Sequence, residues 1–291
     1  MNVILGASGQ VGSAIIDQLI NEKEPVVAVV RNPEKAKELE RKGIQVRIAD
    51  VFDGSALQGA IKEGNTLFVL TPETTSSTDV IGETKTLLTN YRNAINGSSI
   101  KKVVGLSSMG AQHPIGNLKM SYLLERAFEG LDVQTVLVRP AYYFSNWLLY
   151  LDTIMAEGLL PTFYPTDLKM PMISPLDVAD FLTNVIVQDV EGNPIYELEG
   201  PGWCNPNDVA TTFGNILGRS VEASQMPRER WGDQLQQAGF TQDSAKNFIE
   251  MTQAVNDGKA KPEGNGAILV KTQTTFKEYV ADAISRSRSA A

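Results

Sequence analysis

The chain begins with a glycine-rich turn between two apolar runs. In the segment MNVILGASGQVGSAIIDQLI, Gly6, Gly9 and Gly12 follow a short apolar run and precede a stretch with helical periodicity. A turn that leaves a parallel strand and opens a helix directs backbone N–H groups and the positive helix end at one point, which suits a pyrophosphate. We therefore predict a dinucleotide site. Gly6 would allow the tight turn, Gly9 the close approach of the diphosphate, and Gly12 the packing of helix on strand.

The glycine spacing is G-x-x-G-x-x-G rather than G-x-G-x-x-G, and an ordinary glycine-rich turn is the alternative. The position of the turn, directly after a strand and inside a unit of about 30 residues, favours the dinucleotide site. The residues of this turn that we expect to contact the cofactor are Gly6, Ser8, Gly9, Gln10, Val11 and Gly12.

Short apolar runs alternate with helical segments through the first half of the chain. We predict strands near Val3–Leu5, Val26–Val30, Gln45–Ile48, Leu67–Leu70, Val103–Leu106 and Thr135–Val138. Helices are predicted near Gln10–Asn21, Pro33–Arg41, Gly54–Lys62, Asp79–Asn96 and Lys119–Glu129. Nearly all-apolar strands joined by helices imply a parallel sheet covered on both faces. The predicted fold class is α/β, a Rossmann doubly wound parallel sheet with a smaller C-terminal substrate lobe.

The pattern changes after Arg139 and Pro140, where aromatic and proline-rich sequence begins, as in RPAYYFSNWLLYL. Such residues suit loops that hold an apolar compound. Helical patterns return over 205–218 and 228–256, with one further strand at 195–198. We predict an NAD(P)-binding Rossmann domain over 1–140 and a mainly helical substrate lobe, interleaved with the sheet, over 141–291.

Composition excludes several classes of function. With 42% hydrophobic and 21% charged residues the chain is typical of globular domains, and its net charge of −8 disfavours nucleic-acid binding. No apolar run approaches the roughly 20 residues of a membrane span, and no basic residue precedes Lys23 as in an export signal. A single cysteine and a single histidine allow no intrachain disulfide and no Cys/His zinc site. We expect a cytoplasmic monomer or homodimer without bound metal, nucleic acid or membrane.

The end of the second predicted strand indicates which nicotinamide cofactor binds. NAD sites usually place an acidic residue there for the ribose 2′-hydroxyl, whereas this chain has Arg31, with Lys35 one turn further on. Cations there suit the 2′-phosphate of NADP(H), and a solvated strand-end arginine is the alternative. Asp50, followed by Val51, ends the third strand and is either an adenine contact or an ordinary turn aspartate.

Five motifs occur in order along the chain: GASGQVG, VRNPEK, ADVFD, VLVRP and MISPLDVADF. With them the sequence resembles the NmrA-like group of atypical short-chain dehydrogenases/reductases, which includes quinone oxidoreductase-like NAD(P)-binding proteins. The resemblance runs through nearly the whole chain. It implies a Rossmann fold with NADP(H). It also implies either a reductase, of the quinone or azo type, or a catalytically silent redox sensor that regulates other proteins.

The resemblance also implies contacts at the ends of three later strands. These are Leu70, Thr71 and Pro72 on the ribose side of the cofactor, Ser107 and Ser108 beside the nicotinamide, and Tyr142 and Tyr143 over its ring.

The catalytic pair of active short-chain dehydrogenases is missing from the corresponding helix. Those enzymes use a tyrosine as proton donor and a lysine four residues on, which lowers the pKa of the phenol. Alignment on the family pattern places Asn117 at the tyrosine position and Ser121 at the lysine position. Tyr122 and Arg126 are an alternative pair at the same spacing, and Lys119 is a further inward-facing candidate; a core tyrosine and a solvated lysine are the plain alternatives.

The candidate catalytic residues are therefore Ser108, Lys119, Tyr122 and Tyr143. His113 follows the fifth strand, and an imidazole is the side chain most suited to acid–base work near neutral pH, although a lone loop histidine is more often incidental. Neither Ser107 nor Ser108 lies in a Gly-x-Ser-x-Gly elbow, which argues against a hydrolase. The sequence predicts an NADPH-dependent reductase of a small planar quinone-like, azo or carbonyl acceptor, with a non-catalytic NADP(H) sensor as the alternative.

Overall fold

A doubly wound parallel sheet forms the centre of the molecule. The computed structural model describes the backbone of residues 1–290 and the side chains of residues 1–286. Eight strands pair in the order β13-β10-β6-β5-β4-β1-β2-β3, all parallel. The first half of the chain contains β1 (Asn2–Ile4), α1 (Gln10–Asn21), β2 (Val26–Val30), α2 (Pro33–Arg41), β3 (Gln45–Ile48), α3 (Gly54–Ile61), β4 (Thr66–Leu70), α4 (Val80–Asn96), β5 (Lys102–Leu106), α5 (Leu118–Arg126) and β6 (Gln134–Pro140). The predicted Rossmann fold is confirmed.

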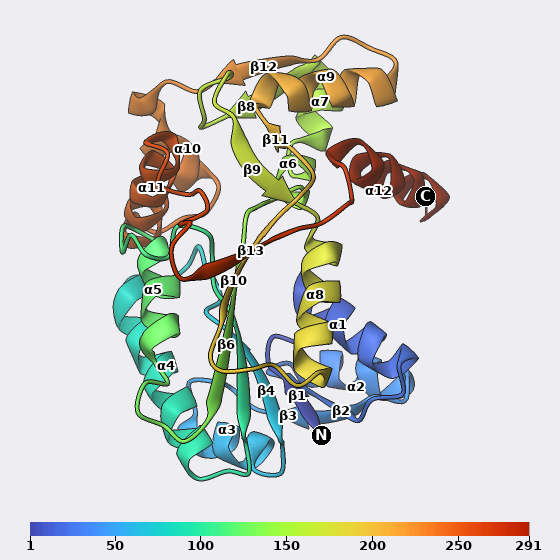
Figure 1. Cartoon of the computed structure of the whole chain (residues 1–291). Coiled ribbons are helices and arrows are strands. Elements are labelled where there is room, and N and C mark those ends of the chain that lie inside the picture. The colour runs from blue at the N-terminus through green and yellow to red at the C-terminus, as the bar shows by residue number, and fades with distance from the viewer. Residues whose placement is uncertain (291) are drawn as a thin grey trace.

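The second half of the chain adds smaller elements above the sheet and also extends the sheet itself (Figure 1). Its elements are β7 (Tyr142–Tyr143), α6 (Ser145–Leu148), α7 (Leu151–Glu157), β8 (Leu159–Thr162), β9 (Met170–Ile173), α8 (Pro175–Val187), β10 (Ile195–Glu199), β11 (Trp203–Cys204), α9 (Pro206–Leu217), β12 (Glu222–Gln225), the 3₁₀ turn η1 (Arg228–Arg230), α10 (Trp231–Gln237), α11 (Gln242–Asn256), β13 (Ala267–Lys271) and α12 (Phe276–Ala290). Two small sheets form here, β11-β9-β7 and β12-β8.

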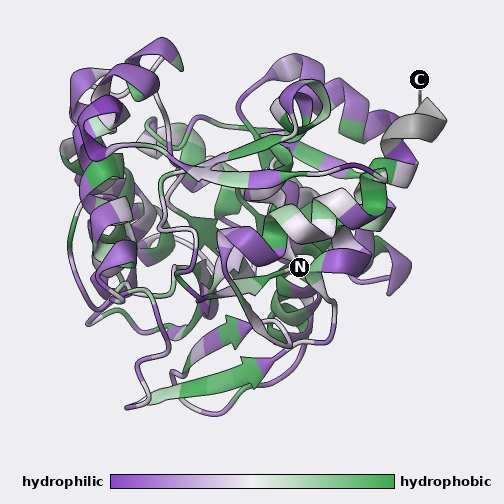
Figure 2. Cartoon of the chain, turned by 90° about the horizontal axis from the view of Figure 1, so that it is seen from above, coloured by the Kyte–Doolittle hydropathy of each residue, from purple (hydrophilic) through white to green (hydrophobic). Residues whose placement is uncertain are grey.

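Alternating side chains of the strands build two separate cores, one on each face of the sheet. Val3 of β1 and Leu67 of β4 pack with α3, α4 and α5, whereas Ile4 and Phe68, the next residues along, pack with α1, α2 and α8. This is the period of two expected for a strand buried on both faces. Figure 1 shows the two helical layers on opposite sides of the sheet, and Figure 2 shows hydrophobic residues gathered on the strands and inner helix faces.

A third core lies in the upper lobe and rests on aromatic side chains. Trp147 is 1% exposed and Phe213 is fully buried, and both pack with Phe144 and Phe276, which ties α12 to the lobe. Edge-to-face ring contacts run through this core, for example between Phe144 and Phe276 at 5.3 Å. Some of the aromatic residues after Pro140, which the sequence analysis assigned to substrate-holding loops, therefore pack in the core of the lobe.

Local signals explain where most helices begin. Asp53 accepts hydrogen bonds from the backbone at the start of α3, Asp79 does so for α4 and Ser174 for α8. Asn205 and Asp208 form a reciprocal capping box at the start of α9. In the part of the chain that the structure describes, no helix is both long and apolar enough to cross a membrane.

Candidate functional site

The strand order reverses direction at β1. From β1 the chain moves outward to β2 and β3, and it then returns to the other side of β1 with β4, β5 and β6. In open α/β sheets, ligands bind in the crevice beyond the carboxyl ends of the strands at such a reversal. The glycine-rich turn after β1 and the loops after β4, β5 and β6 therefore border the expected binding crevice.

Two of the three glycines in the first turn, Gly6 and Gly12, are required by its geometry. Gly6 has a φ of 62°, in the left-handed region, and its carbonyl accepts a hydrogen bond of 2.9 Å from the N–H of Gly9. A Cβ atom on Gly12 would lie 2.3 Å from that same carbonyl oxygen. A side chain at position 12 would thus force the helix away from the turn, which is the packing role expected for this glycine.

The N-terminus of α1 is open to an anion. Its N-cap, Gly9, has no side chain to accept from the first-turn N–H groups, and no acidic residue lies in that turn. Gly6, Ser8, Gly9 and Gln10 are exposed here, while Val11 is buried. By contrast, α3 has its first N–H groups satisfied by an aspartate. Uncapped N–H groups at an exposed helix end fit a diphosphate.

Arg31 and Lys35 lie on the exposed side of the next strand end. Arg31 directly follows β2, and among the described residues its side chain has no hydrogen bond or ion pair. Lys35 forms an exposed ion pair with Glu38 at 2.8 Å. The guanidinium of Arg31 is thus free for a phosphate, whereas Lys35 has a local partner.

Asp50 and Val51 already have local hydrogen-bonding roles in the loop after β3. The Asp50 carboxylate accepts the Phe52 N–H at 2.9 Å, and the Val51 carbonyl accepts from the Asn90 side chain at 3.0 Å. The adenine contact of Asp50 stays a prediction beside this turn role.

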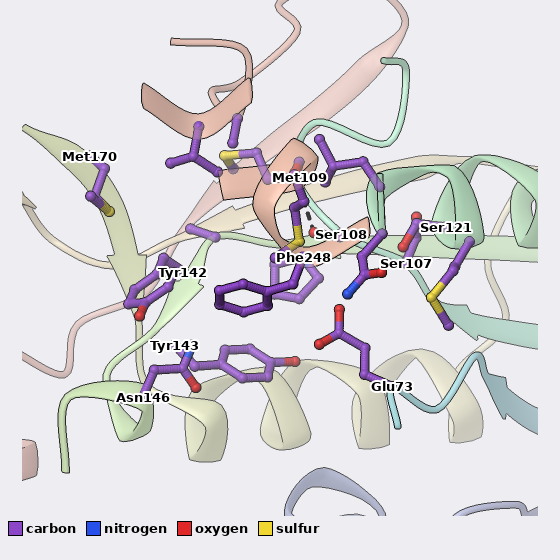
Figure 3. A pocket seen from close by; sticks show the side chains of 18 of the residues that line it. Glu73, Ser107, Ser108, Met109, Ser121, Tyr142, Tyr143, Asn146, Met170 and Phe248 are labelled. Atoms are coloured by element: carbon purple, nitrogen blue, oxygen red, sulfur yellow. Dashed lines mark hydrogen bonds between the residues drawn. The ribbon is translucent and has the colours of Figure 1, made fainter. Parts of the chain in front are cut away.

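A cavity of about 450 Å³ lies beyond the carboxyl ends of β4, β5 and β6. Its volume is in the usual range for a small-molecule site. Aromatic and sulfur-containing side chains line most of it: Tyr142, Tyr143, Tyr150, Tyr164, Phe248, Met109, Met120, Met170 and Met251. Polar side chains also reach it: Thr71, Glu73, Ser107, Ser108, Asn117, Ser121 and Asn146. Figure 3 shows several of these groups converging from different elements.

The structure brings most of the residues predicted at the strand ends to this cavity. Its lining includes Leu70, Thr71, Ser107, Ser108, Tyr142 and Tyr143, but not Pro72. Leu70 also touches the glycine-rich turn, since a Cβ on Gly6 would lie 2.7 Å from its Cδ2 atom. The cavity and the turn are therefore adjacent, and a single extended ligand could reach both.

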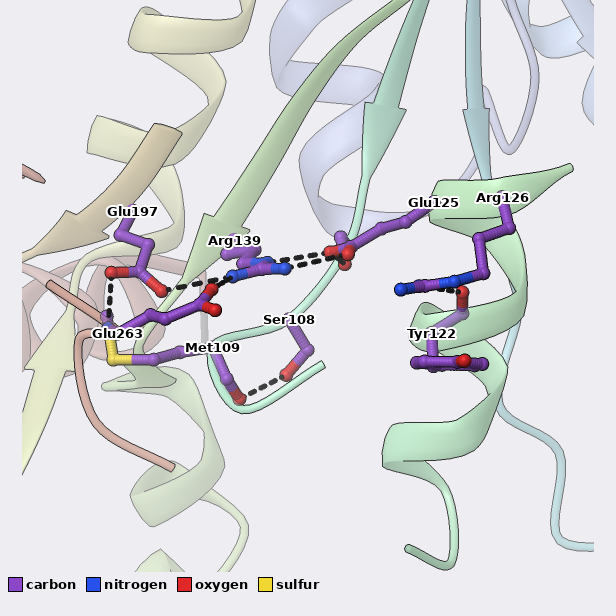
Figure 4. Close-up of polar contacts among 9 residues, drawn as sticks. Ser108, Met109, Tyr122, Glu125, Arg126, Arg139, Glu197 and Glu263 are labelled. Atoms are coloured by element: carbon purple, nitrogen blue, oxygen red, sulfur yellow. Dashed lines mark hydrogen bonds and ion pairs between the residues drawn. The ribbon is translucent and has the colours of Figure 1, made fainter. Parts of the chain in front are cut away.

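The structure separates the two residues that the family pattern aligns with the catalytic pair from the alternative pair. Asn117 and Ser121 line the cavity, whereas Tyr122 and Arg126 do not. The Arg126 guanidinium lies over the Tyr122 ring, 3.7 Å from its centroid, and donates to the Tyr122 carbonyl at 3.2 Å (Figure 4). Lys119, like His113, is also absent from the cavity lining. The catalytic roles of Lys119 and Tyr122 stay predictions.

Burial raises the pKa of both tyrosines over the cavity. Desolvation is the main cause for Tyr142 and the cause for Tyr143, so both phenols are neutral near pH 7. Tyr164, whose ring meets that of Tyr142 edge to face, raises the pKa of Tyr142 further, and Asn146 lowers it in part. These hydroxyls are therefore suited to hydrogen bonding rather than to acting as phenolate bases.

Glu73 is a cavity residue that the sequence analysis missed. It lies in the loop after β4, and its exposed side chain lines the cavity together with Asn117. Desolvation raises the pKa of the Glu73 carboxyl, and the interaction with the Asn117 side chain lowers it only in part. Its place just past a strand end at the reversal was the signal that could have found it.

A buried ionic cluster supports one wall of the cavity (Figure 4). The Arg139 side chain is 4% exposed and forms a bidentate pair with Glu125, at 2.7 and 2.8 Å. Its other terminal nitrogen contacts Glu197 at 3.4 Å and Glu263 at 2.5 Å. The Ser107 hydroxyl donates to Glu125 at 2.6 Å. The cluster therefore connects the end of β5 to α5, β6, β10 and the loop before β13.

Comparisons with known proteins identify the family of the chain. The NAD(P)H-binding family matches residues 6–189, more than half of the chain. Quinone oxidoreductase 2 of Escherichia coli is 25% identical over 243 residues, 82% of each chain, and the NAD(P)H azoreductase of Xenophilus azovorans is 25% identical over 226 residues, 76% of this chain and 75% of that one. A crystal structure of an Escherichia coli NADPH-dependent quinone oxidoreductase complexed with NADPH superposes with a TM-score of 0.82, at 23% identity and over 98% of this chain and 100% of that chain. The chain belongs to the NAD(P)H-binding family, among the atypical short-chain dehydrogenases/reductases that its sequence resembles.

Proposed function

We propose that the chain is an NADPH-dependent reductase that transfers a hydride to a small planar acceptor of the quinone, azo or carbonyl type. The observation that carries the proposal is the adjacency of two sites. An uncapped, glycine-rich helix N-terminus lies beside an aromatic-lined cavity at the reversal of the strand order. In this proposal residues 1–140 hold the cofactor, and residues 141–291 complete the cavity for the acceptor.

The residues of the chain supply binding and orientation. The first-turn N–H groups of α1 would hold the diphosphate, and Arg31 the 2′-phosphate. When bound, NADPH supplies the hydride. The hydroxyl groups of Ser108 and Tyr143 line the cavity and would hydrogen-bond an oxygen or nitrogen of the acceptor. Aromatic walls exclude water and favour a flat, apolar compound.

The wall chemistry supports this acceptor class. Rings such as Tyr142 and Phe248, with several methionines, offer polarizable apolar surface to a planar molecule. A quinone ring is electron-poor, so hydride addition to it needs less help from a general acid than addition to an ordinary carbonyl. Two relatives, named as a quinone oxidoreductase and an azoreductase, support the same class.

The second candidate is a non-catalytic NADP(H) sensor. It is favoured by one observation: Asn117 and Ser121 stand in the cavity where the family's catalytic pair is expected. Incubation with NADPH and a panel of quinones, azo dyes and aldehydes discriminates the two. The reductase consumes NADPH with at least one acceptor, and the sensor consumes none. The cytoplasmic location and the monomeric or homodimeric state stay predictions.

We expect NADPH to bind more tightly than NADH. Replacing Arg31 with alanine should reduce this preference by about 1–3 kcal/mol, the range of a charge-assisted hydrogen bond, because the freely available guanidinium is lost. Calorimetric titration of both cofactors into both proteins measures the change. Lys35→Ala is the matched control, with a smaller expected effect because Lys35 already pairs with Glu38. Equal affinity of the unmutated protein for NADH and NADPH would contradict the assignment.

Replacing Tyr122 with phenylalanine should change turnover only mildly. The variant keeps the ring under Arg126 and deletes only a hydroxyl that does not line the cavity. Loss of a true general acid would instead cost about 100- to 10,000-fold. Steady-state kinetics with the best acceptor of the panel provides the measurement. A drop of three orders of magnitude would show that Tyr122 and Arg126 are a working variant of the family's catalytic pair.

A further inference from the structure

Glu73 is the single charged side chain in the cavity lining, among the residues that the structure describes. The loop after β4 carries it, and Figure 3 shows its carboxyl group pointing into the cavity. It enters from the wall that also carries Leu70 and Thr71, next to the glycine-rich turn. A titratable group thus lies where the acceptor and the reactive end of the cofactor would meet.

The groups that face Glu73 leave its carboxyl without a counter-ion. Asn117, just before α5, and Tyr164, from the loop after β8, interact with it electrostatically, and both are neutral side chains. Tyr143 contributes a hydroxyl to the lining, and α11 contributes the apolar Phe248 and Met251. No lysine, arginine or histidine lines the cavity in the described chain. Such surroundings favour the neutral acid, which has a proton to give.

The position of Asn117 in the family pattern bears on the role of Glu73. Alignment on the family pattern places Asn117 at the position of the tyrosine that donates the proton in active short-chain dehydrogenases, and an amide has no proton of suitable acidity. The side chain of Asn117 interacts with the Glu73 carboxyl, while its Oδ1 atom is buried without a partner among the described residues. The cavity therefore has an asparagine at the aligned tyrosine position and an acid, Glu73, from another strand end.

We propose that protonated Glu73 is the proton donor to the acceptor and that Asn117 positions its carboxyl group. This inference rests on the proposed reductase function. The acceptor gains a hydride from NADPH, which is oxidised to NADP⁺. The Glu73 O–H bond breaks as a new O–H or N–H bond forms on the acceptor. The carboxylate then regains a proton from water, so one hydride and one proton are consumed per acceptor reduced.

The contribution of such a donor depends on the acceptor. Proton transfer matters most where the reduced acceptor is a strong base and least where it is a stable anion. Along a series of benzoquinones, from halogenated to methylated rings, the reduced product becomes more basic. The loss caused by Glu73→Gln should therefore grow along this series, and azo or aldehyde acceptors should lose about 100- to 10,000-fold in kcat.

The dependence of kcat on pH tests whether the protonated form of Glu73 is the active one. The acid must be protonated to act, so kcat of the wild-type protein should be full at low pH and fall as the pH rises through the raised pKa of Glu73. In Glu73→Gln this fall of kcat with rising pH should be absent, and in Glu73→Asp it should be partly restored. Asn117→Ala should lower kcat but should still show a fall of kcat with rising pH. Glu63→Gln is the matched control, since Glu63 is a surface residue paired with Arg47, away from the cavity.

A second readout does not depend on turnover. A carboxyl whose pKa is raised in the folded state keeps its proton where the unfolded chain has lost it, so stability falls as the pH rises through this window. Glu73→Gln removes that slope. The unfolding free energy of the variant minus that of the wild type should therefore increase with pH, from the ordinary glutamate range up to the raised pKa. Glu63→Gln should show no such trend.

The outcomes separate this inference from the proposed function. An unchanged pH profile in an active Glu73→Gln protein overturns the donor role and leaves the reductase intact. A KM for cationic acceptors that falls as the pH rises, with kcat unaffected by the variant, also overturns it, because Glu73 would then be a carboxylate that binds cations. Tight NADPH binding without turnover of any acceptor overturns the reductase, and the donor role with it.

Discussion

Replacing Gly9 with valine is expected to abolish measurable NADPH binding and to leave the fold intact. Gly9 lies at the exposed N-cap of α1, with extended backbone angles of −82° and 169° that a branched residue can adopt. A Cβ there would lie 3.2 Å from the Gly6 carbonyl oxygen, a tight contact that a small shift relieves. The two methyl groups, however, would occupy the space in which a diphosphate meets the first-turn N–H groups.

Two matched glycine variants make this result interpretable. Gly59→Val places the same side chain in open space on α3 and should bind NADPH as the wild type does. Gly12→Ala should destabilise the turn itself, because its Cβ would lie 2.3 Å from a backbone oxygen. Calorimetric titration with NADPH, beside a thermal melt of each variant, separates lost binding from lost folding. Wild-type affinity for NADPH in a folded Gly9→Val protein would show that the diphosphate does not bind at this turn.

Replacing Arg139 with methionine should lower the free energy of unfolding by about 3–5 kcal/mol, the range for removing one partner of a buried ion pair. The substitution keeps an apolar stem of similar length but leaves three carboxylates around the vacated position. Glu125 and Glu197 have side chains only 4% and 1% exposed, so water cannot replace the guanidinium.

Urea unfolding followed by circular dichroism measures this loss. The control is Arg286→Met, which breaks an exposed pair with Asp282 one helical turn away; its expected cost is about 0.5 kcal/mol or less. A loss for Arg139→Met no greater than that of the control would mean that the cluster contributes no stability. Because Ser107 donates to Glu125, the variant should also disturb the cavity wall and weaken acceptor binding.

The sequence was sufficient for the parts of the fold that depend on local patterns. The helices predicted at Gln10–Asn21 and Pro33–Arg41 and the strand predicted at Val26–Val30 have those bounds in the structure. The two helices follow a turn or a capping residue, and the strand is a short all-apolar run between turn residues. The edge strand Ala267–Lys271 was not predicted, because its short apolar run pairs with β10 across about 70 residues of intervening chain.

The candidate site was only partly predictable for the same reason. The glycine-rich turn and the strand-end residues follow from position along a doubly wound sheet, which the sequence pattern reveals. Glu73 and the Arg139 cluster depend on contacts between segments far apart in sequence. Nothing in the sequence distinguishes the three glutamates from ordinary surface residues. Only the fold places them around the Arg139 guanidinium: Glu125, Glu197 and Glu263.

The central claim is that a cofactor held at the glycine-rich turn reduces an acceptor in the adjacent cavity. Its most direct test is to mix the protein with NADPH carrying deuterium at the transferred position, together with the acceptor panel, and follow cofactor oxidation. We expect oxidation that requires both protein and acceptor, is slower with deuterium, and disappears in Gly9→Val. Tight binding of NADPH with no oxidation by any acceptor would contradict it.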